Sequence, residues 1–138
     1  MYSDADVLLL GHQANPFKFI KKATLFVFPS LWEGFPNALI EAMGCKVPVV
    51  AANCETGPKE ILMENKEMFG LLLPAFTDIF TAFQNDITAL EEEWANTITE
   101  LLNDKKKMEY YSTQSAKRSK KYSIENTGSQ WRQLLEEI

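Results

Sequence analysis

The chain has 138 residues, about the length of one domain, and its 46% hydrophobic and 24% charged residues are ordinary for a globular protein. The 14 basic and 19 acidic residues give a formal net charge of −5, which argues against a nucleic-acid partner. The two cysteines have no metal-ligand neighbours and fit free thiols in a reducing cytoplasm. Neither a signal peptide nor an apolar run of membrane-spanning length is recognisable, so we expect a cytoplasmic protein whose membrane contact would be peripheral, at the inner face.

Short apolar runs alternate with helical segments through the first half of the chain. Turn-forming residues bound these runs, as is typical of buried strands. The predicted strands are Asp6–Leu10, Leu25–Phe28, Val47–Ala52 and Gly70–Leu73. Helices are expected from Pro16, Pro36 and Pro58, since proline at the first helical position loses no hydrogen bond. In the helix from Pro16, we expect Phe17, Phe19 and Ile20 to face inward. This alternation predicts an α/β domain with a Rossmann-like parallel sheet of about four strands and flanking helices.

A long connection separates this core, residues 5–74, from C-terminal helices over residues 87–138. Residues 75–86 are interpreted as an ordered insertion with aromatic side chains packed on the body, because long connections are uncommon in compact domains. The first C-terminal helix, over residues 87–102, has Leu90, Trp94, Ile98, Leu101 and Leu102 at helical spacing. We expect that face to be buried.

Two more helices are predicted after this one. Asn103-Asp104 caps a basic helix over residues 105–121. Its charges favour a solvated helix face, and attraction to anionic lipid head groups is the alternative. A last helix, from Ser123 or Ile124, forms a helical tail and has apolar residues at core-like spacing, namely Trp131, Leu134 and Leu135.

The segment that leads into the helix at Pro36 contains the candidate functional groups. If the helix begins there, free N–H groups at its positive end form an anion pocket. These groups belong to Phe35, Asn37, Ala38 and Leu39. Gly34 lets the main chain approach a ligand closely, Glu33 precedes the helix, and Glu41 lies one turn after Asn37 on the same face. An amide pocket between two carboxylates suits a phosphorylated sugar or a nucleotide-sugar.

Another face of the same helix is apolar. Leu39, Ala42 and Met43 lie on it at the spacing of a face that packs on a sheet, so we expect them to point inward.

His12 is the only histidine, and it follows the first predicted strand. The carboxyl ends of parallel strands share one edge of the sheet, so His12 would lie near the same cleft. A lone loop histidine is more often a surface or packing residue. We keep it as a candidate contact to the ligand, not as a base.

These residues also carry a resemblance to a known family. The stretches Pro29–Asn37, Glu41–Met43, Val47–Val50 and Gly57–Leu62 resemble the donor-binding domain of family-four (group 1) retaining glycosyltransferases, which have the GT-B fold. The mark of that family is two glutamates with seven residues between them, as in Glu33 and Glu41. The resemblance covers almost all of this chain but only the last part of a full enzyme. It implies an incomplete, N-terminally truncated GT-B C-terminal domain.

The resemblance also implies a reaction. A hexose or N-acetylhexosamine would pass from a nucleoside-diphosphate sugar to a glycan or lipid-linked acceptor, with retention and without a metal or other cofactor. Glu33 would be the catalytic residue that contacts the donor sugar, and Glu41 would bind the ribose. The substrate-binding set would be Gly34, Phe35, Pro36, Asn37, Ala38, Leu39, Glu41 and His12.

Two other interpretations stay open. The chain could be a non-catalytic nucleotide-sugar-binding or interaction fragment that needs its missing N-terminal domain, in cis or in trans. A GT-B epimerase also binds nucleotide-sugars, but that group lacks the Gly-Phe-Pro-Asn arrangement between paired glutamates and ranks low.

Overall fold

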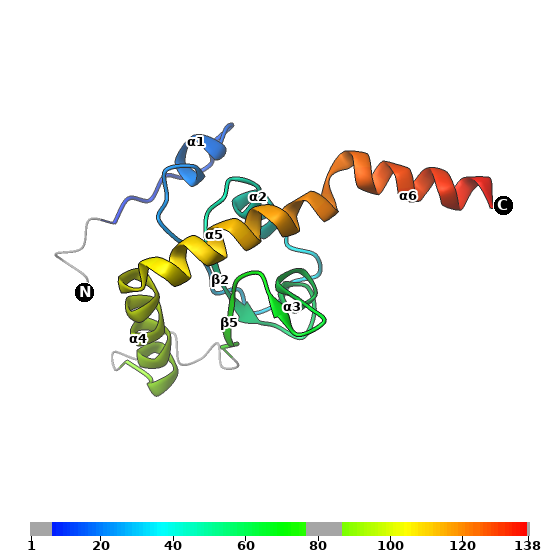
Figure 1. The fold of residues 1–138 in the computed structure, drawn as a ribbon. Coiled ribbons are helices and arrows are strands. Elements are labelled where there is room, and N and C mark those ends of the chain that lie inside the picture. Colours follow the sequence, from blue (N-terminus) through cyan, green and yellow to red (C-terminus); the bar gives the residue numbers. More distant parts are fainter. Residues whose placement is uncertain (1–6, 77–86, 138) are drawn as a thin grey trace.

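The structure is a computed structural model that describes residues 7–76 and 87–137. Helices and strands alternate from α1 to β3, the strands β4 and β5 follow, and the remaining elements of the described chain are helical (Figure 1). In chain order they are α1 (Phe17–Ile20), β1 (Phe26–Phe28), α2 (Asn37–Gly44), β2 (Val49–Asn53), α3 (Pro58–Leu62), β3 (Met63–Glu64), β4 (Glu67–Met68), β5 (Leu71–Pro74), α4 (Ala89–Asn103), α5 (Lys105–Ser119), the 3-10 turn η2 (Lys120–Tyr122) and α6 (Ile124–Glu136).

The sheet has the parallel order β1-β2-β5, with β2 at its centre. Val27 lies opposite Val50 on one side of β2, and Ala51 lies opposite Leu72 on the other. Helix α2 connects β1 to β2, and α3 follows β2, as parallel pairing requires. The short antiparallel pair β3-β4 leads from α3 into β5. The predicted α/β class is confirmed, with three parallel strands among the described residues in place of about four.

Strand β2 divides the core into two clusters because successive side chains point to opposite faces of the sheet. One cluster lies under α2 and α3 and includes Val49 and Ala51 of β2. Its other members are Leu39, Ala42, Met43, Ile61, Leu62 and Phe69. The second cluster contains Val50 and Ala52 together with Cys54, Leu73, Trp94 and Leu101. The predicted inward face of the helix after Pro36, formed by Leu39, Ala42 and Met43, is therefore confirmed.

Helices α4 and α5 cover the sheet and hold its end in place. The indole Nε1 of Trp94 donates a hydrogen bond of 3.0 Å to the carbonyl of Pro74, at the end of β5. Its ring lies 5.1 Å from that of Phe76. Helix α5 packs against α2 and β2 and runs across the molecule in Figure 1. The predicted insertion begins at Ala75, and its residues 77–86 lie outside the described residues.

Two predictions for the N-terminal region are wrong. Residues 7–10 form no strand, and Leu9 is 96% exposed. A strand needs a neighbour for its N–H and C=O groups, and no described segment pairs with these residues. Helix α1 is a single turn that contacts α2. Phe17 and Phe19, which we expected to face inward, are exposed, whereas Ile20 is half-buried in the first cluster.

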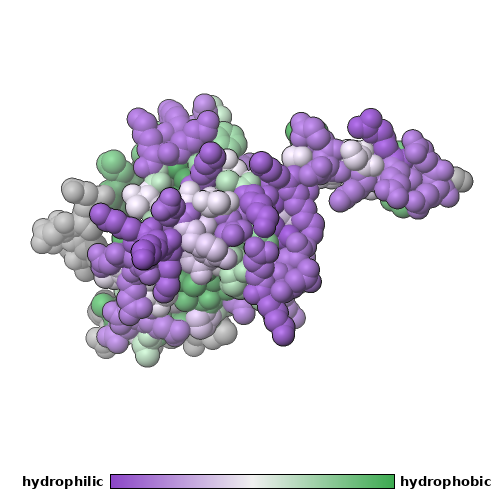
Figure 2. Space-filling view, viewed as in Figure 1, coloured by the Kyte–Doolittle hydropathy of each residue, from purple (hydrophilic) through white to green (hydrophobic). Residues whose placement is uncertain are grey.

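The last helix also departs from expectation. Its apolar spacing predicted core residues, but α6 contains no buried residue, and Trp131 is 61% exposed. Helix α6 extends away from the body beyond η2, and the viewed side of this arm is mostly hydrophilic (Figures 1 and 2). The spacing of apolar residues shows that a helix has one apolar face, but that face is buried only if another element covers it.

Among residues 7–76 and 87–137, no helical segment combines the length and the hydrophobicity of a membrane span.

Candidate functional site

Helix α2 begins at Asn37, with Pro36 as its N-cap in an extended conformation (φ −77°, ψ 94°). The predicted start is therefore one residue early. Proline has no side-chain acceptor, and no side chain caps this end. The N–H groups of Asn37 and Ala38 accordingly have no acceptor among the described residues. The N–H of Leu39 donates to the carbonyl of Pro36 at 3.1 Å, and the Leu39 side chain is buried, so Leu39 is removed from the predicted amide pocket.

Glu33 lines a cavity of about 270 Å³ beside the loop that precedes α2. Its side chain is half-buried, and Gly34 lines the same cavity. Trp32, Glu55 and Thr56 complete the wall. An exposed indole and two carboxylates can contact the apolar and hydroxyl faces of a sugar. The sequence did not single out Trp32, Glu55 or Thr56 as site residues.

Glu41 lies in a different cavity, of about 460 Å³, between α1 and α2. Ala38 and His12 line it with Glu41, so the structure brings these three predicted residues together. Both Glu41 and His12 are exposed. Neither Glu33 nor Glu41 forms an ion pair with a described residue, so both carboxylates are available to a ligand. The two cavities border opposite ends of the Gly34–Ala38 segment, where the free amides lie.

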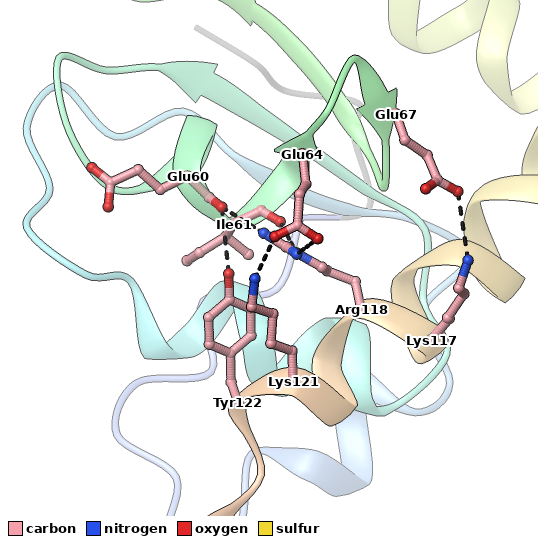
Figure 3. A network of polar contacts seen from close by, with 8 residues as sticks. All are labelled: Glu60, Ile61, Glu64, Glu67, Lys117, Arg118, Lys121 and Tyr122. Carbon is pink, nitrogen blue, oxygen red and sulfur yellow. Dashed lines mark hydrogen bonds and ion pairs between the residues drawn. The ribbon is translucent and has the colours of Figure 1, made fainter. Parts of the chain in front are cut away.

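Phe35 belongs to this segment and is half-exposed, and its ring packs edge-on against that of Tyr122 with centroids 5.5 Å apart. Tyr122 belongs to a polar network that joins η2 and α5 to α3 (Figure 3). In that network Arg118 donates to the carbonyls of Glu60 and Ile61, each at 2.8 Å, and its guanidinium lies 5.4 Å from the Tyr122 ring centroid. Tyr122, more than 80 positions from Phe35 in the sequence, thus supports the loop that precedes α2.

The polar groups of the site are main-chain N–H groups, which can bind an anion, and carboxylates, which can accept hydrogen bonds from hydroxyl groups. No group of three or more His, Cys, Asp or Glu side chains able to hold a metal occurs in the described part of the chain. Burial raises the pKa of the Cys54 thiol, and the nearby Glu33 carboxylate raises it further. This keeps Cys54 in its neutral form beside the Glu33 loop.

Comparisons with known proteins agree with this fold. Residues 2–104 match the family described as Glycosyl transferases group 1. An uncharacterized glycosyltransferase of Methanocaldococcus jannaschii is 36% identical over 145 residues, covering 95% of this chain and 36% of that protein. The N-acetylgalactosamine-N,N'-diacetylbacillosaminyl-diphospho-undecaprenol 4-alpha-N-acetylgalactosaminyltransferase of Campylobacter jejuni is 38% identical over 87 residues, covering 63% of this chain and 23% of that protein. The chain therefore spans about a third or less of the length of these two relatives.

A solved structure extends the likeness to three dimensions. The crystal structure of Anabaena HepE in complex with UDP superposes with a TM-score of 0.70 at 21% identity, covering 88% of this chain and 29% of that one. At this identity the likeness concerns the fold alone. The chain belongs to the group 1 glycosyltransferases, and its fold is that of a GT-B C-terminal domain.

Proposed function

We propose that this chain binds a nucleoside-diphosphate sugar at the start of α2 and serves a glycosyltransferase that passes the sugar to a glycan or lipid-linked acceptor with retention, without a metal or other cofactor. The observation that carries the proposal is the uncapped start of α2: within residues 7–76 and 87–137, the N–H groups of Asn37 and Ala38 have no acceptor and the carboxylates of Glu33 and Glu41 have no ion-pair partner. A diphosphate supplies acceptors for such amides, and sugar hydroxyls supply donors for such carboxylates.

The chemistry follows from where charge develops during transfer. As the bond between the anomeric carbon and the diphosphate breaks, negative charge builds on the leaving oxygen. Amides fixed at a helix start stabilise that charge without reorganising. Glu33 orients the sugar and faces the oxocarbenium-like carbon, and Glu41 holds the ribose. The name of the Campylobacter jejuni relative includes a diphospho-undecaprenol, which supports a lipid-linked acceptor.

Transfer and donor-hydrolysis assays on the whole protein that contains these residues test the proposal. Glu33→Ala is expected to lower kcat about 100-fold, since it removes an interaction made at the reacting sugar. Glu41→Ala is expected to raise the donor KM, because it removes a contact to the nucleotide. Glu93→Ala is the matched control, as it removes an exposed carboxylate of α4. Near-normal rates in both site variants would contradict the assigned roles.

A second function is favoured by one observation: Glu33 and Glu41 line separate cavities. This second function is that of a non-catalytic module: the 138 residues alone would bind a nucleotide or an interaction partner without catalysing transfer. Calorimetric titration with UDP- and GDP-sugars shows whether the donor binds, and the transfer and donor-hydrolysis assays show whether it is turned over. A binding module takes up the donor without turnover.

A further inference from the structure

The loop that carries Glu33 lacks regular structure between the end of β1 at Phe28 and the start of α2 at Asn37. In the part of the chain that the structure describes, main-chain groups of residues 31–35 form no hydrogen bonds to other main-chain groups. A segment of this kind keeps one conformation only if contacts from elsewhere fix it. Besides the ring contact between Phe35 and Tyr122, those contacts come from the loop after β2, residues 54–57.

Residues 54–57 touch the Glu33 loop near its start, at its middle and at its end. The Cys54 thiol donates to the carbonyl of Ser30, with sulfur and oxygen 3.0 Å apart. The Thr56 hydroxyl donates to the carbonyl of Glu33 at 2.5 Å. A Cβ on Gly57 would lie 2.5 Å from the carbonyl oxygen of Gly34 and 2.9 Å from Cδ of Pro36, so the two main chains are in direct contact there.

The residue types at 56 and 57 fit these contacts. Gly57 has a φ of +88° and no room for a Cβ, so both its conformation and its packing require glycine. The Thr56 hydroxyl fixes the carbonyl of Glu33. Because the peptide bond is planar, it thereby also fixes the direction of the Gly34 N–H. Thr56 lines the cavity that contains Glu33, so its hydroxyl acts within the site.

We propose that Thr56 is a positioning residue: its hydroxyl holds the Glu33–Gly34 peptide so that the Glu33 carboxylate and the amides before α2 face one ligand. The proposal rests on the proposed function only for the identity of that ligand. Thr56→Val keeps the shape of the side chain and removes the donor, whereas Thr56→Ser keeps the donor.

Thiol labelling of the full 138-residue chain tests the contact without any donor sugar. In a Cys45→Ser background Cys54 is the only thiol, and because it is 4% exposed a reagent such as DTNB reaches it only when the two loops separate. Thr56→Val is expected to speed labelling about fivefold, the effect of losing about 1 kcal/mol from one hydrogen bond. Thr56→Ser should label at the wild-type rate. Rates taken at several pH values separate loop opening from a change in the pKa of the Cys54 thiol.

Thr99→Val is the matched control. It removes a hydroxyl-to-carbonyl bond of 2.7 Å, from Thr99 to Ala95 in α4, and should leave the labelling of Cys54 unchanged. Equal labelling of Thr56→Val and the wild type would overturn the proposal.

Kinetics of the whole protein test the role of the contact. Thr56→Val is expected to lower kcat about tenfold with the donor KM little changed, and Thr56→Ser is expected to retain the wild-type kcat. Faster labelling with an unchanged kcat would overturn the positioning role. A wild-type protein that transfers no sugar would contradict the proposed function instead, and the labelling rates would still decide whether Thr56 holds the loop.

Discussion

The buried guanidinium of Arg118 lies 2.7 Å from the carboxylate of Glu64, and the Arg118 side chain is only 4% exposed. The same guanidinium donates to the carbonyls of Glu60 and Ile61 near the end of α3. It also lies 4.9 Å from the ring centroid of Phe69. Carbonyls at the end of a helix have no intrahelical partner, so Arg118 satisfies them from α5 and joins α5 to α3.

Arg118→Met should destabilise the fold strongly. It would leave the carbonyls of Glu60 and Ile61 and the carboxylate of Glu64 without their main donor. We expect a loss of about 3 kcal/mol in the free energy of unfolding, measured by urea denaturation. Arg118→Lys keeps the charge but cannot supply all three contacts, so it should fall between Arg118→Met and the wild type. An unchanged midpoint for Arg118→Met would contradict the bracing role of this residue.

Acid should weaken the same network. Hydrogen bonds from Arg118, and then from Lys121, lower the pKa of Glu64 from its ordinary value of 4.5 to about 2. The ionised carboxylate is therefore favoured in the folded state, and its contribution is present above pH 4.5 and is lost as the pH falls toward 2. Unfolding free energies measured between pH 5 and 2 should decline less steeply in Glu64→Gln than in the wild type. Parallel declines would show that Glu64 does not contribute.

Gly70→Ala should be destabilising for a steric reason. A Cβ there would lie 2.5 Å from Cγ2 of Val49 and 3.0 Å from Cδ2 of Leu62, in the buried cluster under α2 and α3. Overpacking of this kind costs about 1–3 kcal/mol, measurable as a lower midpoint of thermal unfolding. Gly128→Ala is the matched control, because a Cβ at that helical position meets nothing within 4 Å. If both variants unfold at the wild-type temperature, the packing around β2 is looser than described.

Removal of α6 should leave the body of the chain intact. No side chain of α6 is buried, and Trp131, Leu134 and Leu135 are exposed. A chain ending at Ser123 should therefore unfold within about 0.5 kcal/mol of the full chain, as surface changes do. A large loss of stability would mean that α6 packs on the body through contacts absent from this structure.

The sequence predicted those elements whose pattern is local. Helical spacing identified Leu39, Ala42 and Met43 as core, and turn residues bounded the strands on either side of α2. The prediction of a strand over residues 6–10 is wrong for residues 7–10, which are the described ones, because an apolar run forms a strand only beside a partner.

Contacts between distant segments had no sequence signal. Thr56 meets Glu33 across 23 positions, and Arg118 meets Ile61 across 57. A basic residue in a basic helix is expected to face solvent. This is correct for the lysines of α5 but not for Arg118, which is buried. Arg118 reaches Ile61 because α5 lies against α3, and Thr56 reaches Glu33 because the loops that follow the paired strands β1 and β2 meet. Composition and the spacing of apolar residues do not predict either contact.

The proposed function requires the N–H groups before and within the first turn of α2 to bind the donor diphosphate. NMR titration of the chain with UDP- and GDP-sugars up to millimolar concentration measures this binding, even when it is weak. We expect the amide resonances of Phe35, Asn37 and Ala38 to shift most, and Glu33→Ala and Glu41→Ala to reduce the apparent affinity. Unchanged resonances for all three amides, or shifts confined to another part of the molecule, would contradict it.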